Sequence, residues 1–385
     1  GLVPDDYRPG IESTRPAAGG SGRSRLVRVG IAIPSYHGRR YIGDTLRSLI
    51  AQTHADWYCV VVNDGEEDGT RDVVRSLSEP RIRYVADGLR RGQLRNFNRA
   101  ILEILRDDAE VVRLLSADDL LYPHDLADML RVLAAHPRVG LVATHYDGID
   151  DDGRPVFRVN MTGRDDLVMT GRDYLLEGVA VGNTIGGPSS VAIRRDALES
   201  AGLFDTRLDY SGDSDLWHRV AAGWDVAWVG RRAGLRYRFH SSSVTARDQY
   251  SPGKFSDSIQ VVRRVAATEA LFGPRWWVHQ YTIGRLHALN LQVMVGMGRR
   301  GHWQGVRAGL RASFREGLLV YAPFWIPRIP YQLVRAALGL PVSRRLFWRR
   351  VHERLQPPRI PAERAPVVAS DASAPPAPEL QESRR

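Results

Sequence analysis

The chain of 385 residues is 43% hydrophobic and 25% charged, which is typical of globular enzymes and predicts a real hydrophobic core. Its single cysteine, Cys59, excludes an intrachain disulfide and favours a reducing compartment. The net charge of +10 favours anionic partners, such as phosphorylated substrates, acidic lipids or nucleic acid.

Both ends of the chain differ in composition from its middle. Residues 1–24 are rich in Gly, Pro, Ser and Arg, and residues 356–385 are rich in Pro and Ala, so we expect a disordered lead-in and a disordered tail. No signal peptide is expected, because no charged segment is followed by an apolar one near the first residue. The best apolar run, 317–327, is shorter than the roughly 20 residues that a membrane span needs.

Strand and helix patterns alternate through the first half of the folded region. The predicted strands are 26–34, 57–63, 81–86, 110–116 and 139–146, and the predicted helices are 39–53, 70–77, 93–105 and a segment after Pro123. Strands separated by helices of this length indicate parallel βαβ units, with helices on both faces of the sheet. Ligands of such sheets bind beyond the carboxyl ends of the strands.

Polar clusters follow three of the predicted strands. They read PSYHG from residue 34, NDGEED from residue 63 and SADD from residue 116, so we expect them to converge on one crevice. Asp118 and Asp119 would lie near its middle. Mg²⁺ and Mn²⁺ take oxygen ligands and often combine one or two carboxylates with substrate phosphates. The two acids therefore predict either a metal site or a helix cap before Pro123.

The region from 275 to 350 carries 13 arginines and one acid, Glu316. Trp, Tyr and Leu stand among these arginines at helical spacing. Amphipathic helices lying on an anionic membrane would have this pattern. A helical subdomain packed on the preceding domain, with solvated arginines, explains it equally well. Nucleic-acid binding has no supporting motif and is not expected.

Several motifs, in order from about Val27 to about Thr245, resemble the inverting GT-A glycosyltransferases of family 2. They are the opening strand, turn, helix and loop through 27–70, RGQLRNFNRAI at 91–101, LLSADDLLYP at 114–123, and AGLFDTRLDYSGDSDLWHRVAAGW at 201–224. The resemblance implies an α/β fold of GT-A type, with an open, mostly parallel sheet flanked by helices and a C-terminal helical extension. We expect the GT-A domain at 25–255 and a basic, aromatic-rich helical extension at 256–355.

The resemblance also implies an activity. It predicts a metal-dependent, inverting glycosyltransferase of hexosyltransferase type, with Mn²⁺ or Mg²⁺ as cofactor. A UDP- or dTDP-sugar would donate the sugar, and a hydroxyl of a glycan or lipid-linked acceptor would receive it, as in cell-surface polysaccharide synthesis. We expect a cytoplasmic enzyme that could bind an anionic membrane surface on the inner face of the cell membrane.

The family's site residues map onto named positions of this chain. Asp213 would be the catalytic base, because a carboxylate within hydrogen-bonding distance can accept the proton of a sugar hydroxyl; its other possible role is a helix N-cap. The nucleotide-sugar site would contain Pro34, Ser35, Tyr36, Asn63, Asp64, Arg95, Asn96 and Asp118, and the metal site would contain Asp118, Asp119 and His240. Arg236 and Arg238 could instead meet the diphosphate. Residues 182–190 have the Gly and Ser content of a mobile loop over an acceptor.

The motifs depart from the family pattern at four positions. Asn63 and Glu66 replace an aspartate and a serine of the donor loop, Ser116 replaces the first acid of the metal motif, and Gly212 replaces an acid before Asp213. The missing acids leave open a non-catalytic binding or scaffold module of the same fold. A nucleotidyltransferase is the enzymatic alternative, although PSYHGRR lacks that class's Gly-rich phosphate loop.

Overall fold

The computed structural model describes residues 27–159, 165–230, 232–240, 252–266, 276–299 and 301–326. The predicted lead-in and tail lie outside these residues, as does the predicted extension beyond residue 326. A second compact unit that begins at Ala337 lies outside them too.

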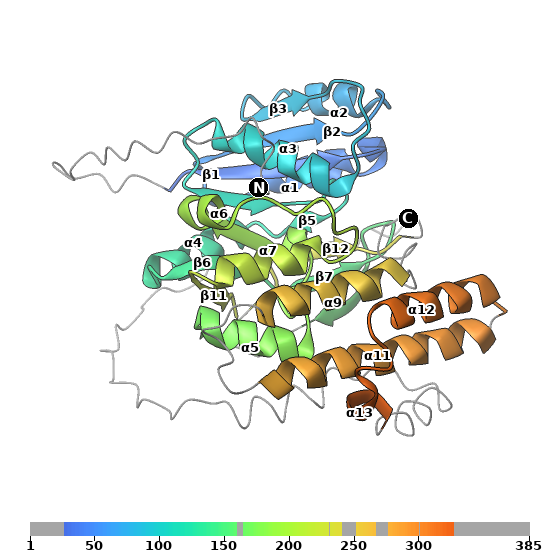
Figure 1. Ribbon diagram of the computed structural model, residues 1–385. Coiled ribbons are helices and arrows are strands. Elements are labelled where there is room, and N and C mark those ends of the chain that lie inside the picture. Colours follow the sequence, from blue (N-terminus) through green and yellow to red (C-terminus); the bar gives the residue numbers. More distant parts are fainter. Residues whose placement is uncertain are drawn as a thin grey trace, which may run out of the picture. The chain divides into compact units, whose positions relative to one another are not determined.

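An eight-stranded sheet forms the centre of the fold, in the order β3-β2-β1-β4-β10-β6-β11-β9 (Figure 1). Its strands are β1 Val29–Ser35, β2 Trp57–Asn63, β3 Ile82–Val85, β4 Val111–Leu114, β6 Val139–Ala143, β9 Leu167–Met169, β10 Val191–Arg194 and β11 Asp225–Trp228. Strands β1 to β4 run parallel, as do β6 and β11. Strand β10 is antiparallel to both β4 and β6, and β9 is antiparallel to β11. The predicted open, mostly parallel α/β sheet is confirmed.

A second, four-stranded sheet contains β5 Leu120–Leu121, β12 Leu235–Arg238, β7 Tyr146–Ile149 and β8 Pro155–Val159. The prediction of one strand at 139–146 is therefore wrong, because β6 and β7 belong to different sheets. The chain leaves the large sheet at Thr144, whose N–H donates to the carbonyl of Ser190 and whose hydroxyl accepts from the N–H of Gly234. The polar residues Thr144 and His145 stand between the two strands.

Eleven helices surround the sheets in the described part of the chain. They are α1 Ile42–Ile50, α2 Thr70–Ser76, α3 Gln93–Leu105, α4 Asp125–Ala135, α5 Gly171–Val181, α6 Arg195–Ala201, α7 Gly212–Ala221, α9 Pro252–Ala266, α11 Trp276–Arg299, α12 Trp303–Arg315 and α13 Ala322–Trp325, with 3-10 turns at Gly38–Arg40 and Pro188–Ser190. The four helices predicted in the first half correspond to α1, α2, α3 and α4.

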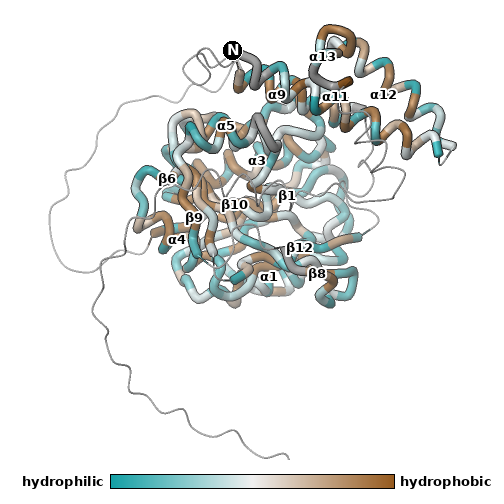
Figure 2. The backbone as a smooth tube through the Cα atoms, turned by 90° about the horizontal axis from the view of Figure 1, so that it is seen from below, coloured by the Kyte–Doolittle hydropathy of each residue, from teal (hydrophilic) through white to brown (hydrophobic). Residues whose placement is uncertain are grey.

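Two hydrophobic clusters cover the two faces of the large sheet. Strand β2 shows the arrangement, because Tyr58 and Val60 join one cluster while Cys59 and Val61 join the other. Side chains of a strand alternate between faces, so a strand covered on both sides reads as a continuous apolar run. Hydrophobic residues accordingly concentrate in the strands (Figure 2).

Helices α9, α11 and α12 pack against one another after the second sheet (Figure 1). The amide of Asn290 on α11 donates to the carbonyl of Gly309 and to the hydroxyl of Ser313, both on α12. A Cβ at Gly309 would lie 2.8 Å from Met294 of α11, so close helix packing requires this glycine. None of the described helices has the length and apolar character needed to cross a bilayer.

Candidate active site

The carboxyl ends of β1 and β2 form the first part of the site. Ser35 ends β1 and Asn63 ends β2, and both side chains are almost fully buried. The N–H of Asp64 donates to the carbonyl of Ser35, which closes the two strand ends together. The Asn63 amide donates to the carbonyls of Gly65 and Glu66, so it holds the loop that follows.

Several buried polar atoms at these strand ends have no hydrogen-bond partner among the described residues. They are Ser35 Oγ, Asn63 Oδ1, Asp68 Oδ2, Thr70 Oγ1 and Asn96 Oδ1. Buried polar groups are normally paired, so a cluster of unpaired atoms calls for water or a ligand. Gly38 makes room beside them, because a Cβ there would lie 2.1 Å from Ser35 Oγ. The cluster fits a polar ligand.

Two of the predicted nucleotide-sugar residues also hold the backbone in place. Both oxygens of Asp64 are engaged, since they accept from the N–H groups of Arg91 and Gly92 just before α3. Asn96 is buried and donates to the carbonyl of Val62. Each side chain can therefore shape the pocket while keeping spare acceptor capacity for a ligand.

The rim of this pocket contains exposed side chains. Tyr36 is 46% exposed, and the guanidinium of Arg90 lies 4.5 Å from the centre of its ring. Arg95 is exposed at the start of α3, with its guanidinium 3.5 Å from the carbonyl of Arg91. Pro34 is half-buried within β1, where it pairs in register with Val62.

The second part of the site follows β4. Nε2 of His240 lies 2.9 Å from Oδ2 of Asp118, so residues far apart in the sequence meet here. The side chain of Asp118 is 30% exposed and that of His240 is 9% exposed. The ring of Tyr41 lies 5.3 Å from the His240 ring, between centroids.

Asp119 and Arg238 hold this loop together. One oxygen of Asp119 accepts from the N–H of Arg238 at 2.8 Å, and the carboxylate is buried. The Arg238 guanidinium donates to the carbonyls of Asp118, Asp150 and Asp151. Three backbone carbonyls thus occupy the Nε and Nη1 donors of Arg238, and its contact with the diphosphate stays a prediction. Arg236 stacks on the ring of Tyr122 at 5.5 Å.

The three predicted metal ligands do not gather around one point. Within the described ranges, no group of three His, Cys, Asp or Glu side chains is placed to hold a metal ion. Asp118 and His240 do meet, with one carboxylate oxygen and one imidazole nitrogen. Two protein ligands completed by substrate oxygens fit a Mg²⁺ or Mn²⁺ ion.

Asp213 lies in the first turn of α7, and Ser211 is the N-cap. Its Oδ1 accepts from the N–H of Ser214, and its Oδ2 accepts from the amide of Asn183 at 3.1 Å. Burial raises the pKa of Asp213 to about 6, although these hydrogen bonds and Lys254 oppose the shift. A carboxylate whose pKa lies close to neutral pH can act efficiently as a general base.

The loop at 182–190 connects Asp213 to the end of β4. Its Asn183 amide binds both Asp213 and the carbonyl of Gly186. At the other end of the loop, the Ser189 hydroxyl accepts from the N–H of Ser116 and donates to the Ser116 hydroxyl, both at 2.9 Å. The loop is thus fastened at both ends, and its mobility stays a prediction. Asn183 was not predicted from the sequence.

Asp215 has a different role from Asp213. It is buried and pairs with Arg219 at 2.9 Å and with Arg264 of α9 at 2.7 Å. One oxygen therefore pairs within α7, and the other ties α9 to α7. This arrangement leaves Asp213 as the acid of α7 that is free for chemistry.

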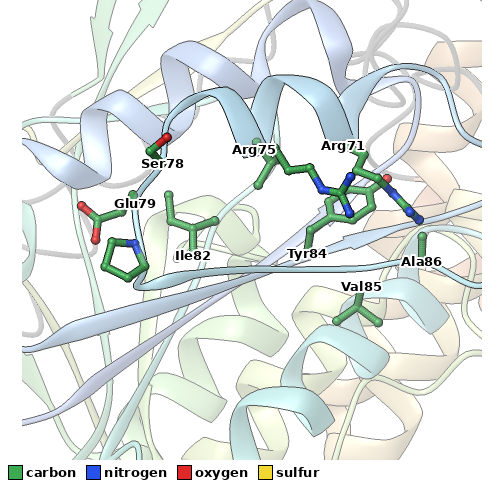
Figure 3. Close-up of a pocket in the computed structure, with 10 residues that line it drawn as sticks. Arg71, Arg75, Ser78, Glu79, Ile82, Tyr84, Val85 and Ala86 are labelled. Carbon is green, nitrogen blue, oxygen red and sulfur yellow. The ribbon is translucent and has the colours of Figure 1, made fainter.

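A separate cavity of about 580 Å³ lies between α2 and β3 (Figure 3). None of the predicted site residues lines it. Glu67, in the loop after β2, connects this loop to the cavity. Its carboxylate accepts from the hydroxyl of Tyr84 and pairs with Arg71, and both of these residues line the cavity. The cavity is therefore beside the candidate site and not part of it.

Part of the chain resembles known glycosyltransferases. Residues 30–202, which run from β1 to the end of α6, match the family model described as glycosyl transferase family 2. Residues 30–202 are therefore similar to this family. The match contains Asp118 and Asp119 but ends before Asp213.

Two relatives and one solved structure show the extent of the similarity. An uncharacterised glycosyltransferase of Nostoc is 30% identical over 178 residues, 45% of this chain and 52% of its own. The Bacillus subtilis glycosyltransferase TuaG, named for teichuronic acid biosynthesis, is 28% identical over 220 residues, 57% of this chain and 81% of its own. The chain thus spans about half the length of the Nostoc relative.

The chain also shares its fold with S. aureus TarS. Residues 1–349 of TarS, solved with UDP-GlcNAc, align with a TM-score of 0.53 and 16% identity, over 80% of this chain and 81% of that one. The expected GT-A fold is confirmed.

Proposed function

We propose that this glycosyltransferase is a metal-dependent, inverting hexosyltransferase. It would move a sugar from a nucleotide donor to an acceptor hydroxyl in one displacement. The observation that carries the proposal is the loop at 182–190, which binds Asp213 at one end and Ser116, two residues before Asp118, at the other. The loop thereby connects the proposed base to the segment that carries the proposed diphosphate-binding acid.

The donor would occupy the ends of β1 and β2. The unpaired polar atoms around Ser35 and Asn63 would meet the nucleoside. A UDP-sugar, or the related dTDP-sugar, is proposed because TarS, which shares the fold, was solved with UDP-GlcNAc. TuaG supports an acceptor of the cell-surface polysaccharide type, either a glycan or a lipid-linked sugar.

Asp118 and His240 would hold the Mn²⁺ or Mg²⁺ ion, with donor phosphates completing its coordination. The ion, when bound, would neutralise charge on the departing diphosphate. Asp119 would act through structure, because it fixes the backbone at Arg238 and so the approach of β12 to Asp118. Asp213 would accept the proton of the acceptor hydroxyl as the new glycosidic bond forms.

Removing divalent metal should abolish sugar transfer. We expect EDTA to reduce product formation to background, and excess Mn²⁺ or Mg²⁺ to restore it. The reason is that Asp118 and His240 alone cannot neutralise the negative charge of the departing diphosphate as the ion would. Nucleoside diphosphate release from the donor, measured with and without each metal, checks this result. Undiminished turnover in metal-free buffer would refute the metal role.

The pH dependence of kcat/KM should report the titration of Asp213. The carboxylate must be ionised to accept a proton, and its pKa is raised to about 6. We therefore expect kcat/KM to fall about tenfold per pH unit below about pH 6. An ordinary, solvated aspartate would place this fall near pH 4, and such a profile would contradict the assignment.

A panel of donors tests the function itself. The full chain is incubated with UDP-, dTDP- and GDP-sugars and a mixture of glycan and lipid-linked acceptors, and the release of nucleoside diphosphate is followed. We expect one uridine or thymidine donor class to be consumed. In a parallel incubation with nucleoside triphosphates and a sugar phosphate, release of pyrophosphate would instead indicate a nucleotidyltransferase. Binding of a donor without any turnover would indicate a scaffold.

We also propose that the enzyme works at the inner face of the cell membrane, where a lipid-linked acceptor would be presented. The basic, aromatic-rich helices after residue 275 support this location.

A further inference from the structure

Helix α12 presents large apolar side chains to solvent. Trp303 is 63% exposed, Leu310 is 38% exposed and Phe314 is 58% exposed. With 3.6 residues per turn, these three positions fall within about 40° of one another around the helix axis. The opposite side of α12 is the packed one, with Ala312 and Ser313 buried. The exposed stripe is therefore not needed for packing in the described fold.

The apolar exposure continues beyond the helix. Leu319 and Val320, in the turn before α13, are more than 70% exposed. Single exposed apolar residues are normal on a protein surface, whereas several together mark an interaction site. We call Trp303, Arg307, Leu310, Arg311, Phe314, Leu319 and Val320 the α12 face.

Two arginines lie beside the apolar stripe. Arg307 and Arg311 are exposed, stand four positions apart, and form no ion pair with any described residue. Helix α12 contains no acid, and like charges at this spacing repel each other. An anionic partner would relieve the repulsion. Arg315, by contrast, is turned to α9, where it donates to the Ser256 hydroxyl.

The chemistry of this face fits one class of partner best. Hydrophilic and hydrophobic residues mix along α12 (Figure 2), and Trp and Phe beside arginine are the side chains of helices that lie in a membrane interface. The arginines would meet anionic head groups and the apolar stripe would enter the acyl boundary. A nucleic acid would satisfy the arginines but would leave Leu310 and Val320 in water.

We propose that the α12 face docks on the surface of an anionic lipid bilayer. The inference deepens the proposed function and rests on it, because a lipid-linked acceptor would lie in the same membrane. The contacts continue from α12 to the base: Glu316 pairs with Arg263 of α9, and Arg264 of α9 pairs with Asp215 of α7. Docking would therefore hold the helix that carries Asp213 at the membrane surface.

Vesicle co-sedimentation of the full chain tests the proposal. Vesicles of phosphatidylcholine with about 30% phosphatidylglycerol, a fraction chosen to give an anionic surface, are compared with pure phosphatidylcholine. We expect binding to the anionic vesicles that weakens with salt. Changing Arg307→Gln and Arg311→Gln together should lower the partition coefficient about 30-fold, since each arginine near such a surface contributes about a factor of five. Leu310→Ser with Phe314→Ser should also reduce binding.

Matched control variants distinguish an effect of the α12 face from an effect of the protein's net charge. Arg75→Gln with Arg106→Gln makes the same charge change at exposed positions on α2 and after α3, and Val156→Ser removes an exposed apolar residue on β8. These variants should keep wild-type binding. Equal loss in the control arginine variant, or no preference of the wild type for anionic vesicles, would overturn the proposal.

Two further measurements distinguish membrane docking from dimerisation and from a failure of the proposed function. If size-exclusion chromatography shows a dimer that the Leu310 and Phe314 changes dissociate, the face belongs to a second copy and membrane docking is overturned. Donor hydrolysis in solution should be the same in the arginine variants and the wild type. Vesicle binding without any hydrolysis in the wild type would sink the proposed function and leave the docking surface standing.

Discussion

Asp213→Asn should abolish sugar transfer while donor binding survives. The amide keeps the shape, and its single oxygen can still accept one of the two hydrogen bonds, from Ser214 or from Asn183, but it cannot take the acceptor's proton. We expect kcat to fall by about 10²- to 10⁴-fold. Nucleotide affinity, measured by calorimetry with UDP and Mn²⁺, should stay within about twofold, because the nucleoside pocket at the ends of β1 and β2 is untouched.

Asp209→Asn is the matched control for this change. Asp209 is an exposed acid four residues before Asp213 in the same segment, so its replacement should leave kcat near the wild-type value. If Asp213→Asn instead lost nucleotide binding along with activity, Asp213 would belong to the donor pocket or to the folding of α7. Unchanged turnover would remove it from catalysis.

Asp125→Ala should produce the largest loss of stability. Arg113 and Asp125 form an ion pair at 3.0 Å, and both side chains are fully buried. The Arg113 guanidinium also donates to the carbonyls of Leu114 and Val191, so it ties α4 to β4 and β10. Removing one partner leaves an uncompensated buried charge, which costs about 3–5 kcal/mol.

Asp128→Ala is the control for the stability prediction. Asp128 lies in the same first turn of α4 and pairs with Arg232 at 2.9 Å, but the Arg232 side chain is 56% exposed. An exposed pair contributes about 0–1 kcal/mol. Urea unfolding of both variants compares the two losses. Similar midpoints would show that burial of the Arg113 pair contributes little.

The first half of the fold could be predicted closely from the sequence. Strand β2 and helix α3 were predicted with the observed bounds, because a continuous buried run and a 3.6-residue apolar period are local signals. Strand β10 was not predicted. Its register pairs Ala192 with Arg113, about 80 residues away, and no local pattern records that an antiparallel strand separates β4 from β6.

The positions of individual site residues could be predicted from the sequence, but the hydrogen bonds that connect them could not. Polar residues at strand ends indicated where Ser35, Asn63 and Asp118 would lie, since parallel strands end at one edge. The role of Arg238 depends on three carbonyls from two separate segments, at Asp118 and at Asp150 and Asp151, which no spacing reveals. Asn183 stands in a loop whose Gly and Ser content suggested mobility, and only the folded structure brings its amide to Asp213.

The stereochemistry of donor hydrolysis tests the central claim most directly. With water in place of the acceptor, proton NMR of the anomeric region follows the sugar released from an α-linked donor before it equilibrates. Direct attack by a water that Asp213 deprotonates predicts the β-anomer first, with loss of this product in Asp213→Asn. Release of the α-anomer, or an equal yield from the variant, would contradict single displacement with Asp213 as the base.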